Sequence, residues 1–174
     1  MWWRSTLRCT NLTRVYWGCN MCKKSINQLV TEFRHAIDAA KANGEFDEDF
    51  SFRHFPRGCC GDASDLLGQY FLVNGISSWY VCGNYYGKND FFQSHAWLVI
   101  DDNLIVDITG DQFRDNAIFL QYNVPAYIGQ TDSFHALFQV EERNVRKTVP
   151  LNSLGCLDPY RLPNLYQRIC KYID

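Results

Sequence analysis

The sequence predicts a single α+β domain in which N-terminal helices pack on an antiparallel β-sheet. Two segments with helical spacing of apolar residues come first, at 23–44 and 60–73, and strand-like runs follow one another from residue 77 onward. Apolar residues make up 47% of the chain and aromatic residues 16%, which is enough to fill a core in a chain of 174 residues.

Residues 1–20 differ from the rest of the chain, because they hold three tryptophans and scattered arginines without periodicity. We expect them to form a loosely attached extension before one domain at 21–174. The apolar runs are far shorter than a membrane span, and the basic N-terminus is not followed by the apolar segment of a signal peptide. The net charge is −2 without a basic patch, so we expect a cytoplasmic protein that binds neither nucleic acid nor membrane. Export of the protein by a dedicated secretion machinery stays open as an alternative to this location.

The first helix is predicted within residues 23–44. Its apolar residues recur at three- and four-residue steps, namely Ile26, Leu29, Val30, Phe33, Ile37 and Ala40. Gly44 is suited to end this helix, because glycine adopts the left-handed conformation of a helix C-terminus at low cost. Pro56 and Gly58 then interrupt regular structure before the second helix begins.

The second helix is predicted at 60–73, where an Asn-Gly pair follows its last residue. The remaining elements are short: strands at 77–82, 92–100, 104–109, 117–121 and 136–140, a flexible loop at 83–90, and a closing helix at 163–172. The Asp-Asp-Asn sequence at 101–103 favours a tight turn, so we expect the second and third strands to form a hairpin.

Cys60 is the candidate nucleophile because it lies at the predicted start of a helix. Unpaired backbone N–H groups and the helix dipole favour negative charge there, which lowers the pKa of a thiol. Gly58 and Gly61 leave room for a substrate carbonyl to approach the sulfur, and the N–H of Cys60 can then donate to the oxyanion. Cys59 is the less favoured nucleophile and is expected to face inward.

His95 and Asp107 are candidates for the base and for the acid that orients it. They lie twelve positions apart on the two strands of the predicted hairpin. The carboxylate would accept from one ring nitrogen and leave the other facing the sulfur. With the turn at 101–103, His95 falls opposite a residue between Asp107 and Thr109. A one-residue slip would turn Asp107 to the other face of the sheet.

At the residues GCCGDAS (58–64), SHAWLVID (94–101) and VDIT (106–109), the chain resembles the papain-like and transglutaminase-like cysteine hydrolases. The resemblance covers residues 54–113 and rests on the order of these short motifs. It implies a papain-like or transglutaminase-like core, with Cys60 as nucleophile, His95 as base and Asp107 as orienting acid.

The chain departs from this family pattern at two places. Gly61 follows the candidate nucleophile where the family often has tryptophan, and no upstream glutamine is available for the oxyanion. His54, six residues before Cys60, is a candidate donor in its place. Gln112, just after the strand that carries the acid, is a second candidate for oxyanion or substrate contacts, although local turn chemistry explains it equally well.

These residues predict a thiol-dependent hydrolase or acyl transferase that acts on an amide or isopeptide bond of a protein or peptide through an acyl-enzyme. Water as acceptor would make it a peptidase (a thiol protease), an amidase or a deamidase, and an amine would make it transglutaminase-like. We expect neither a cofactor nor a catalytic metal.

Two other functions stay open at the level of sequence. The chain could be a non-catalytic interaction module that keeps the thiol-hydrolase fold. It could also be a metal-binding or redox protein that uses Cys19 and Cys22 together with Cys59 and Cys60, although no further pair follows at zinc-finger spacing. His135 is interpreted as structural or surface-exposed.

Overall fold

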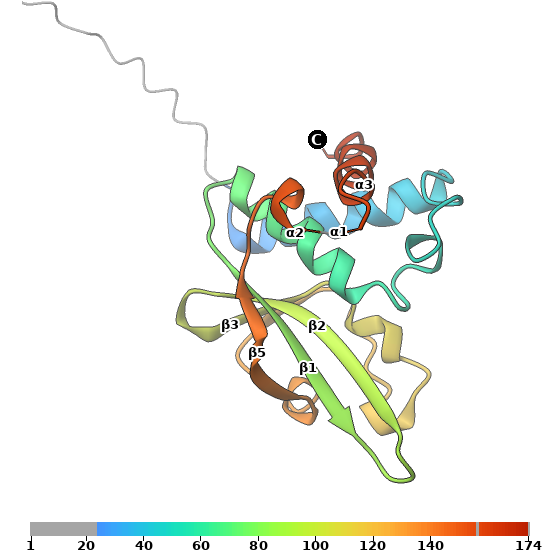
Figure 1. Cartoon of the computed structure of the whole chain (residues 1–174), viewed down its shortest axis with the longest axis vertical. Helices are drawn as coiled ribbons and strands as arrows, with labels where there is room; N and C mark the ends of the chain where they lie inside the picture. Colours follow the sequence, from blue (N-terminus) through green and yellow to red (C-terminus); the bar gives the residue numbers. More distant parts are fainter. Residues whose placement is uncertain (1–23, 156, 174) are drawn as a thin grey trace, which may run out of the picture.

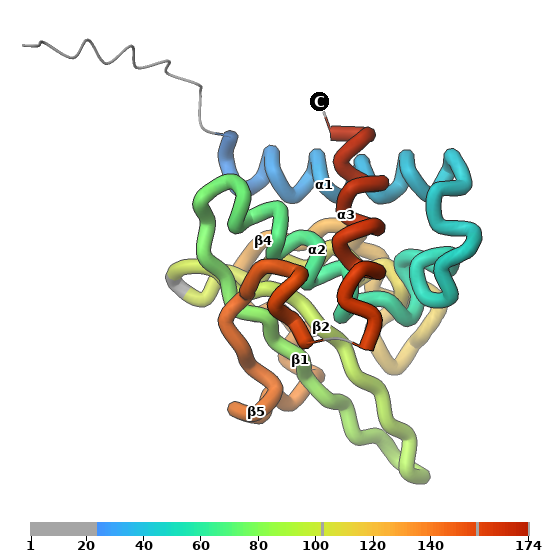
Figure 2. The backbone as a smooth tube through the Cα atoms, turned by 45° about the horizontal axis from the view of Figure 1, so that its top comes forward, coloured from blue at the N-terminus to red at the C-terminus, as the bar shows by residue number. Residues whose placement is uncertain are grey.

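The computed structural model describes residues 24–155 and 157–173. This part of the chain is α+β, with helices on one side of an antiparallel sheet (Figure 1). The α-helices are α1 (Ile26–Ala42), α2 (Cys60–Val73) and α3 (Arg161–Cys170). Helix α2 packs against the sheet, while α3 crosses α1 farther from it (Figure 2). The predicted class is therefore confirmed at the level of α+β.

The sheet has the strand order β4-β3-β2-β1-β5, and every neighbouring pair is antiparallel. Its strands are β1 (Trp79–Tyr86), β2 (Phe92–Ile100), β3 (Leu104–Asp107), β4 (Tyr127–Gly129) and β5 (Gln139–Lys147). The predicted hairpin between β2 and β3 is confirmed, with Leu98 opposite Val106.

Helix α1 begins and ends where local chemistry favours it. The Ser25 side chain accepts from the backbone of Gln28, and the Gln28 side chain accepts from the backbone of Ser25, which together form a capping box. Gly44 follows the helix in the left-handed region at φ +75°, as its sequence position predicts.

The two faces of the sheet carry two different apolar clusters. On β2, Leu98 and Ile100 belong to the large core between the sheet and the helices, whereas Trp97 belongs to a smaller cluster on the opposite face. Because side chains alternate along a strand, the odd-numbered His95 shares its face with Trp97. The histidine therefore lies among aromatic rings rather than in the main core.

Three sequence-based assignments are wrong. Residues 83–86 belong to β1, and only the turn after it, closed by the bond from Gly87 N–H to Phe91 O at 2.8 Å, is a loop. Residues 117–121 form no strand, because Leu120 and Gln121 have left-handed φ values of +59° and +50°. The strand predicted at 136–140 is instead a 3₁₀ turn at His135–Leu137 followed by β5.

Candidate active site

Cys60 is the first residue of α2, as its sequence position predicts. Gly58 precedes the helix at φ +71°, a left-handed conformation that glycine adopts without strain. Cys59 occupies the N-cap position and is only 2% exposed. Burial raises the pKa of the Cys59 thiol to about 12, so this sulfur stays protonated near neutral pH. The two adjacent thiols therefore have different environments, and only Cys60 is suited to react.

Cys60 is half-buried where α2 packs against β2. Burial by itself would raise the pKa of this thiol, but a hydrogen bond with the His95 ring, the charge of that ring and a backbone hydrogen bond from Ala96 lower it below its ordinary value. A lowered pKa increases the share of the thiolate, which is the nucleophilic form of cysteine.

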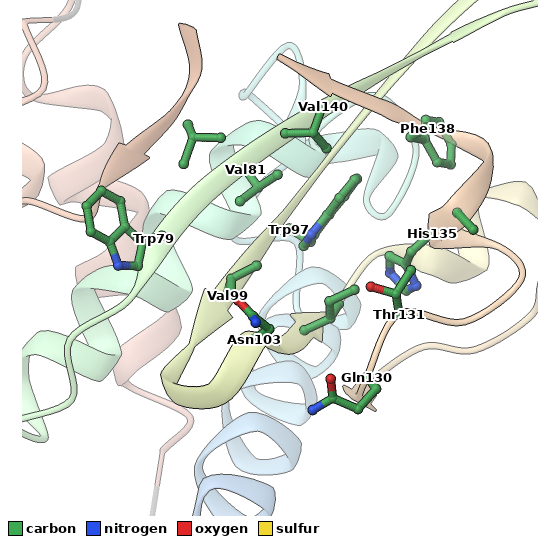
Figure 3. A pocket seen from close by; sticks show the side chains of 13 residues that line it. Trp79, Val81, Trp97, Val99, Asn103, Gln130, Thr131, His135, Phe138 and Val140 are labelled. Atoms are coloured by element: carbon green, nitrogen blue, oxygen red, sulfur yellow. The ribbon is translucent and has the colours of Figure 1, made fainter. Parts of the chain in front are cut away.

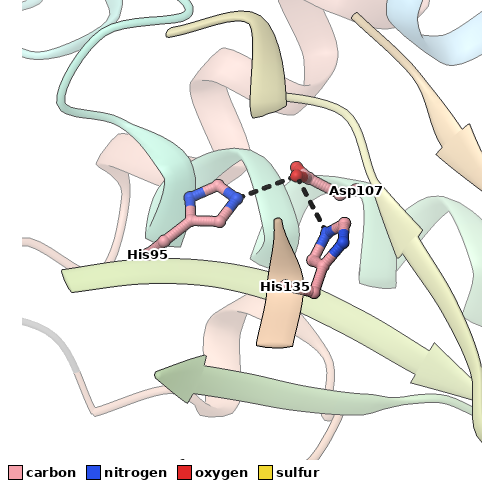
Figure 4. Close-up of side chains that lie close together, drawn as sticks. All are labelled: His95, Asp107 and His135. Atoms are coloured by element: carbon pink, nitrogen blue, oxygen red, sulfur yellow. Dashed lines mark hydrogen bonds and ion pairs between the residues drawn. The ribbon is translucent and has the colours of Figure 1, made fainter. Parts of the chain in front are cut away.

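His95 and Asp107 form a buried pair across the hairpin (Figure 4). Nε2 of His95 lies 2.8 Å from Oδ2 of Asp107, with the two side chains 0% and 1% exposed. The other carboxylate oxygen, Oδ1, accepts from the backbone N–H of Thr109 at 2.8 Å and from its hydroxyl at 3.1 Å. The register of β2 and β3 places both members of the pair on the same face of the sheet, so the slip considered from the sequence does not occur.

The electrostatics of this pair favour an imidazolium beside a carboxylate. Burial alone would lower the pKa of His95, but the charge and hydrogen bond of Asp107, together with the Cys60 thiol, raise it well above its ordinary value. Burial likewise would raise the pKa of Asp107, yet His95 and His135 hold it well below its usual range. Because Nε2 faces Asp107, Nδ1 is the nitrogen left to exchange a proton with Cys60.

Gln112 contacts the base of the site, whereas the described contact of His54 is with Arg53. Nε2 of Gln112 lies 3.2 Å from Nδ1 of His95 and donates to the carbonyl of Thr109 at 3.1 Å. His54 is exposed, and its ring accepts from the Arg53 side chain at 3.1 Å. None of the described contacts of His54 reaches the sulfur or its base, so its role in the oxyanion site stays a prediction.

His135 is the site residue that sequence reasoning missed. It is 2% exposed, and its Nε2 lies 3.4 Å from Oδ2 of Asp107, on the side away from His95 (Figure 4). Its Nδ1 lies 2.7 Å from Oδ1 of Asp132. The sequence carried one signal, an aspartate three residues before a histidine, but the contact with Asp107 depends on how the chain between residues 108 and 134 folds.

Two hollows adjoin this cluster from different sides. A polar one of about 380 Å³ is lined by Arg57, Gly58, Gln93, Gln112, Phe113, Asp115 and Asn116. A larger one of about 760 Å³ lies on the open face of the sheet, where Trp97, Phe138 and His135 form part of its wall (Figure 3). Gln112 therefore joins the polar hollow to Nδ1 of His95, whereas the larger hollow is separated from the Cys60–His95–Asp107 triad by side chains such as Trp97 and His135.

Among the described residues, one group could hold a metal ion: His95, Asp107 and His135, whose ligand atoms lie within 4.8 Å of one another. A cation there would occupy the nitrogen that His95 directs at Asp107. Cys19 and Cys22, the other metal or redox candidates, lie outside the described residues. Cys59 and Cys60 are free thiols, as are Cys82 and Cys170.

Comparison of the chain with protein-family models, with curated proteins and with solved structures finds no match. In the parts of the chain that the structure describes, no helix has the length and apolar character needed to cross a bilayer.

Proposed function

We propose that the protein is a cysteine-dependent hydrolase or acyl transferase that acts on an amide or isopeptide bond, on a papain-like or transglutaminase-like core. The observation that carries this proposal is the chain of contacts from Cys60 to His95 to Asp107, in which a thiol of lowered pKa at a helix start meets a buried, carboxylate-bound imidazole. Packing alone does not require an acid, a base and a thiol to meet in this order.

In the proposed reaction the Cys60 thiolate attacks the carbonyl carbon, and a carbon–sulfur bond forms as the carbonyl oxygen becomes an oxyanion. The His95 imidazolium then gives its Nδ1 proton to the leaving nitrogen, and the carbon–nitrogen bond breaks to leave an acyl-enzyme. Neutral His95 next removes a proton from water or from an incoming amine, which cleaves the thioester and restores the thiolate. Asp107 holds the ring in one orientation throughout.

The N–H of Cys60 and the side-chain amide of Gln112 are the donors that we assign to the oxyanion. The amide nitrogen of Gln112 is 3.2 Å from Nδ1 of His95 and lines the polar hollow beside the helix start. Three side-chain amides and the Arg57–Asp115 ion pair line that hollow. Such a lining suits a polar side chain of a protein or peptide better than a bulky apolar one.

The test uses p-nitrophenyl acetate as a generic acyl donor and intact-protein mass spectrometry. We expect one acetyl group to be added to Cys60, with p-nitrophenolate released as the leaving group. Cys60→Ala should abolish this labelling, whereas Cys59→Ala, the matched control on the neighbouring buried thiol, should retain it. Labelling that survives in Cys60→Ala and disappears in Cys59→Ala would overturn the proposal.

The same experiment separates the proposal from an interaction module. A module that merely keeps the fold would show no preference for Cys60 over an ordinary thiol. Iodoacetamide labelling with peptide mapping, carried out across the pH range, adds an independent readout. The enzyme should alkylate Cys60 at pH values where Cys82, whose thiol pKa is raised by burial, is still unreactive.

A further inference from the structure

A second thiol, that of Cys82, is presented beside the candidate nucleophile and has no role in the proposed reaction. Cys82 pairs with Ala96 in the register of β1 and β2, and the backbone of Ala96 bonds the Cys60 sulfur. Residues directly opposite each other on antiparallel strands direct their side chains to the same face, with Cβ atoms about 5 Å apart. Cys82 therefore stands across from the point of β2 that Cys60 contacts.

The side chain of Cys82 points toward the helical layer. A Cβ at the next residue, Gly83, would lie 2.6 Å from Cβ of Phe138, which belongs to the cluster on the open face of the sheet. Successive side chains of a strand alternate, so Cys82 faces the other way. On that same face the Tyr80 hydroxyl lies 3.1 Å from where a Cβ of Gly61 would stand. This face of β1 thus meets the first turn of α2, which begins at Cys60.

Cys59 is nearer along the chain but is the less suitable partner for Cys60. A trans peptide bond joins the two residues, so their Cα atoms lie about 3.8 Å apart, which is below the span of about 4.4–6.8 Å found in most disulfides. The Cys59 thiol is buried and donates to the carbonyl of Pro56 at 3.5 Å. Cys82 is only half-buried, and both Cys60 and Cys82 are free thiols.

The two facing thiols differ in reactivity. Burial, and after it the charge of Cys60, raise the pKa of the Cys82 thiol above its ordinary value. The influence of that charge agrees with the register in placing the two groups close together. An oxidant that reacts with thiolates therefore meets its first target at Cys60, and Cys82 stays reduced until that reaction has taken place.

We infer that Cys60 and Cys82 form a reversible disulfide in the presence of a peroxide, with Cys82 as the cysteine that resolves the oxidised nucleophile. This inference rests on the proposed function, which supplies a reactive Cys60. The disulfide would block acyl transfer until it is reduced.

The chemistry proceeds in two steps. The Cys60 thiolate attacks one oxygen of hydrogen peroxide, the O–O bond breaks, hydroxide leaves, and the sulfur is oxidised to a sulfenic acid. The Cys82 thiol then attacks this sulfur, an S–S bond forms, and water leaves. Because both sulfurs belong to one folded chain, the second step competes well with further peroxide, which would carry Cys60 on to sulfinic acid. A dithiol reductant restores both thiols and is itself oxidised to a disulfide.

Peroxide treatment of the full chain, followed by alkylation of the remaining thiols and non-reducing peptide mapping, tests this inference directly. Trypsin leaves Cys60 and Cys82 on one peptide, 58–88, and chymotrypsin then cuts at the aromatic residues between them. We expect the two chymotryptic fragments to stay joined, with a mass two hydrogen atoms below their sum. Cys59→Ala should keep this link, and Cys82→Ser should lose it.

Acetylation of Cys60 by p-nitrophenyl acetate gives a second readout. Peroxide should abolish acetylation of the wild-type protein, and dithiothreitol should restore it. Cys82→Ser should be acetylated like the wild type before peroxide. After peroxide it should lose most of the activity that dithiothreitol can restore, with Cys60 two oxygen atoms heavier. Cys170→Ser, at a free thiol of α3, is the matched control and should behave as the wild type throughout.

The outcomes separate this inference from the proposed function. A wild-type Cys60 that is acetylated, but that peroxide carries to sulfinic acid or links to Cys59, would overturn the inference alone. Equal loss of reversibility in Cys82→Ser and Cys170→Ser would do the same. A Cys60 that is neither acetylated nor oxidised ahead of Cys170 would overturn the proposed function as well. The mapping of the wild-type protein holds even if a variant does not fold.

Discussion

Arg34 and Asp111 form a buried bidentate ion pair between α1 and the segment that follows the acid strand. Nη1 and Nη2 of Arg34 lie 3.0 and 2.8 Å from the two carboxylate oxygens, with the side chains 8% and 7% exposed. The same guanidinium donates to the carbonyl of Ile108 at 2.9 Å. Ile108 directly follows Asp107, and Gln112 directly follows Asp111, so this pair fixes the segment that holds both site residues.

Replacement of Arg34 by methionine should lower the free energy of unfolding by about 3–5 kcal/mol, because it leaves the Asp111 carboxylate buried without its counter-charge. Urea denaturation measures the loss. Asp38→Asn removes only an exposed partner of the same guanidinium and should cost less than about 1 kcal/mol. Equal losses in the two variants would contradict the importance of the buried pair. Combining Arg34→Met with Asp111→Leu should recover part of the stability.

Gln112→Ala should separate oxyanion stabilisation from thiol activation. Acyl transfer builds an oxyanion and alkylation does not, so acetylation of Cys60 should fall about a hundredfold while iodoacetamide labelling stays within a few-fold of wild type. Both rates are read by mass spectrometry on the same preparation. An equal decrease in the rates of acetylation and of iodoacetamide labelling would show that Gln112 acts by holding His95, whose Nδ1 it contacts at 3.2 Å.

Asp107→Asn should narrow the pH range of the reaction from its alkaline side. The charge of Asp107 opposes the effect of burial and raises the pKa of His95, so its removal lowers the pH at which the imidazolium loses its proton. The alkaline limb of acetyl transfer should therefore move to lower pH. Thr109→Val removes one hydroxyl contact with Asp107 but leaves the charge of that carboxylate. The alkaline limb of acetyl transfer in this variant should therefore stay at the wild-type pH. A shift of equal size in Thr109→Val would contradict this cause.

Gly68→Ala should destabilise the protein although alanine is the better helix former. A Cβ at this position of α2 would lie 2.4 Å from Cγ2 of Thr148, and the overlap should cost about 1–3 kcal/mol, more than the gain of roughly 1 kcal/mol in helix propensity. Thr148→Ser removes the clashing methyl and keeps the hydroxyl that bonds Ser78. The double variant should therefore recover stability in urea denaturation. No recovery would contradict the steric explanation.

The sequence was most informative where local signals agree. Helix 60–73 and strand 92–100 have the predicted bounds. At the start of the helix, a proline and a glycine that interrupt regular structure stand just before apolar residues with helical spacing. The strand is a continuous run of residues that favour β-structure. The same agreement predicts Cys60, His95 and Asp107 as members of one candidate site.

The segment after Asp107 could not be predicted in the same way. Strand β4 has only three residues, and Leu120 and Gln121 adopt left-handed backbone that no local signal marks. His135 reaches Asp107 only because this irregular segment folds back over the open face of the sheet. A histidine taken alone gives no sign of such a contact, since the partner is set by tertiary packing.

The nucleophile belongs to the helical layer, and its base and acid belong to the sheet. No short stretch of chain holds sulfur and imidazole together, so a partly folded form with intact helices and an intact hairpin would contain every reacting group and still be inert. The reactivity of Cys60 therefore reports whether the helical layer is packed against the sheet. Any ligand, partner or cellular condition that moves α2 away from β2 by the length of one hydrogen bond would separate Cys60 from His95. The thiol would then lose its reactivity although Cys60, His95 and Asp107 are all unchanged.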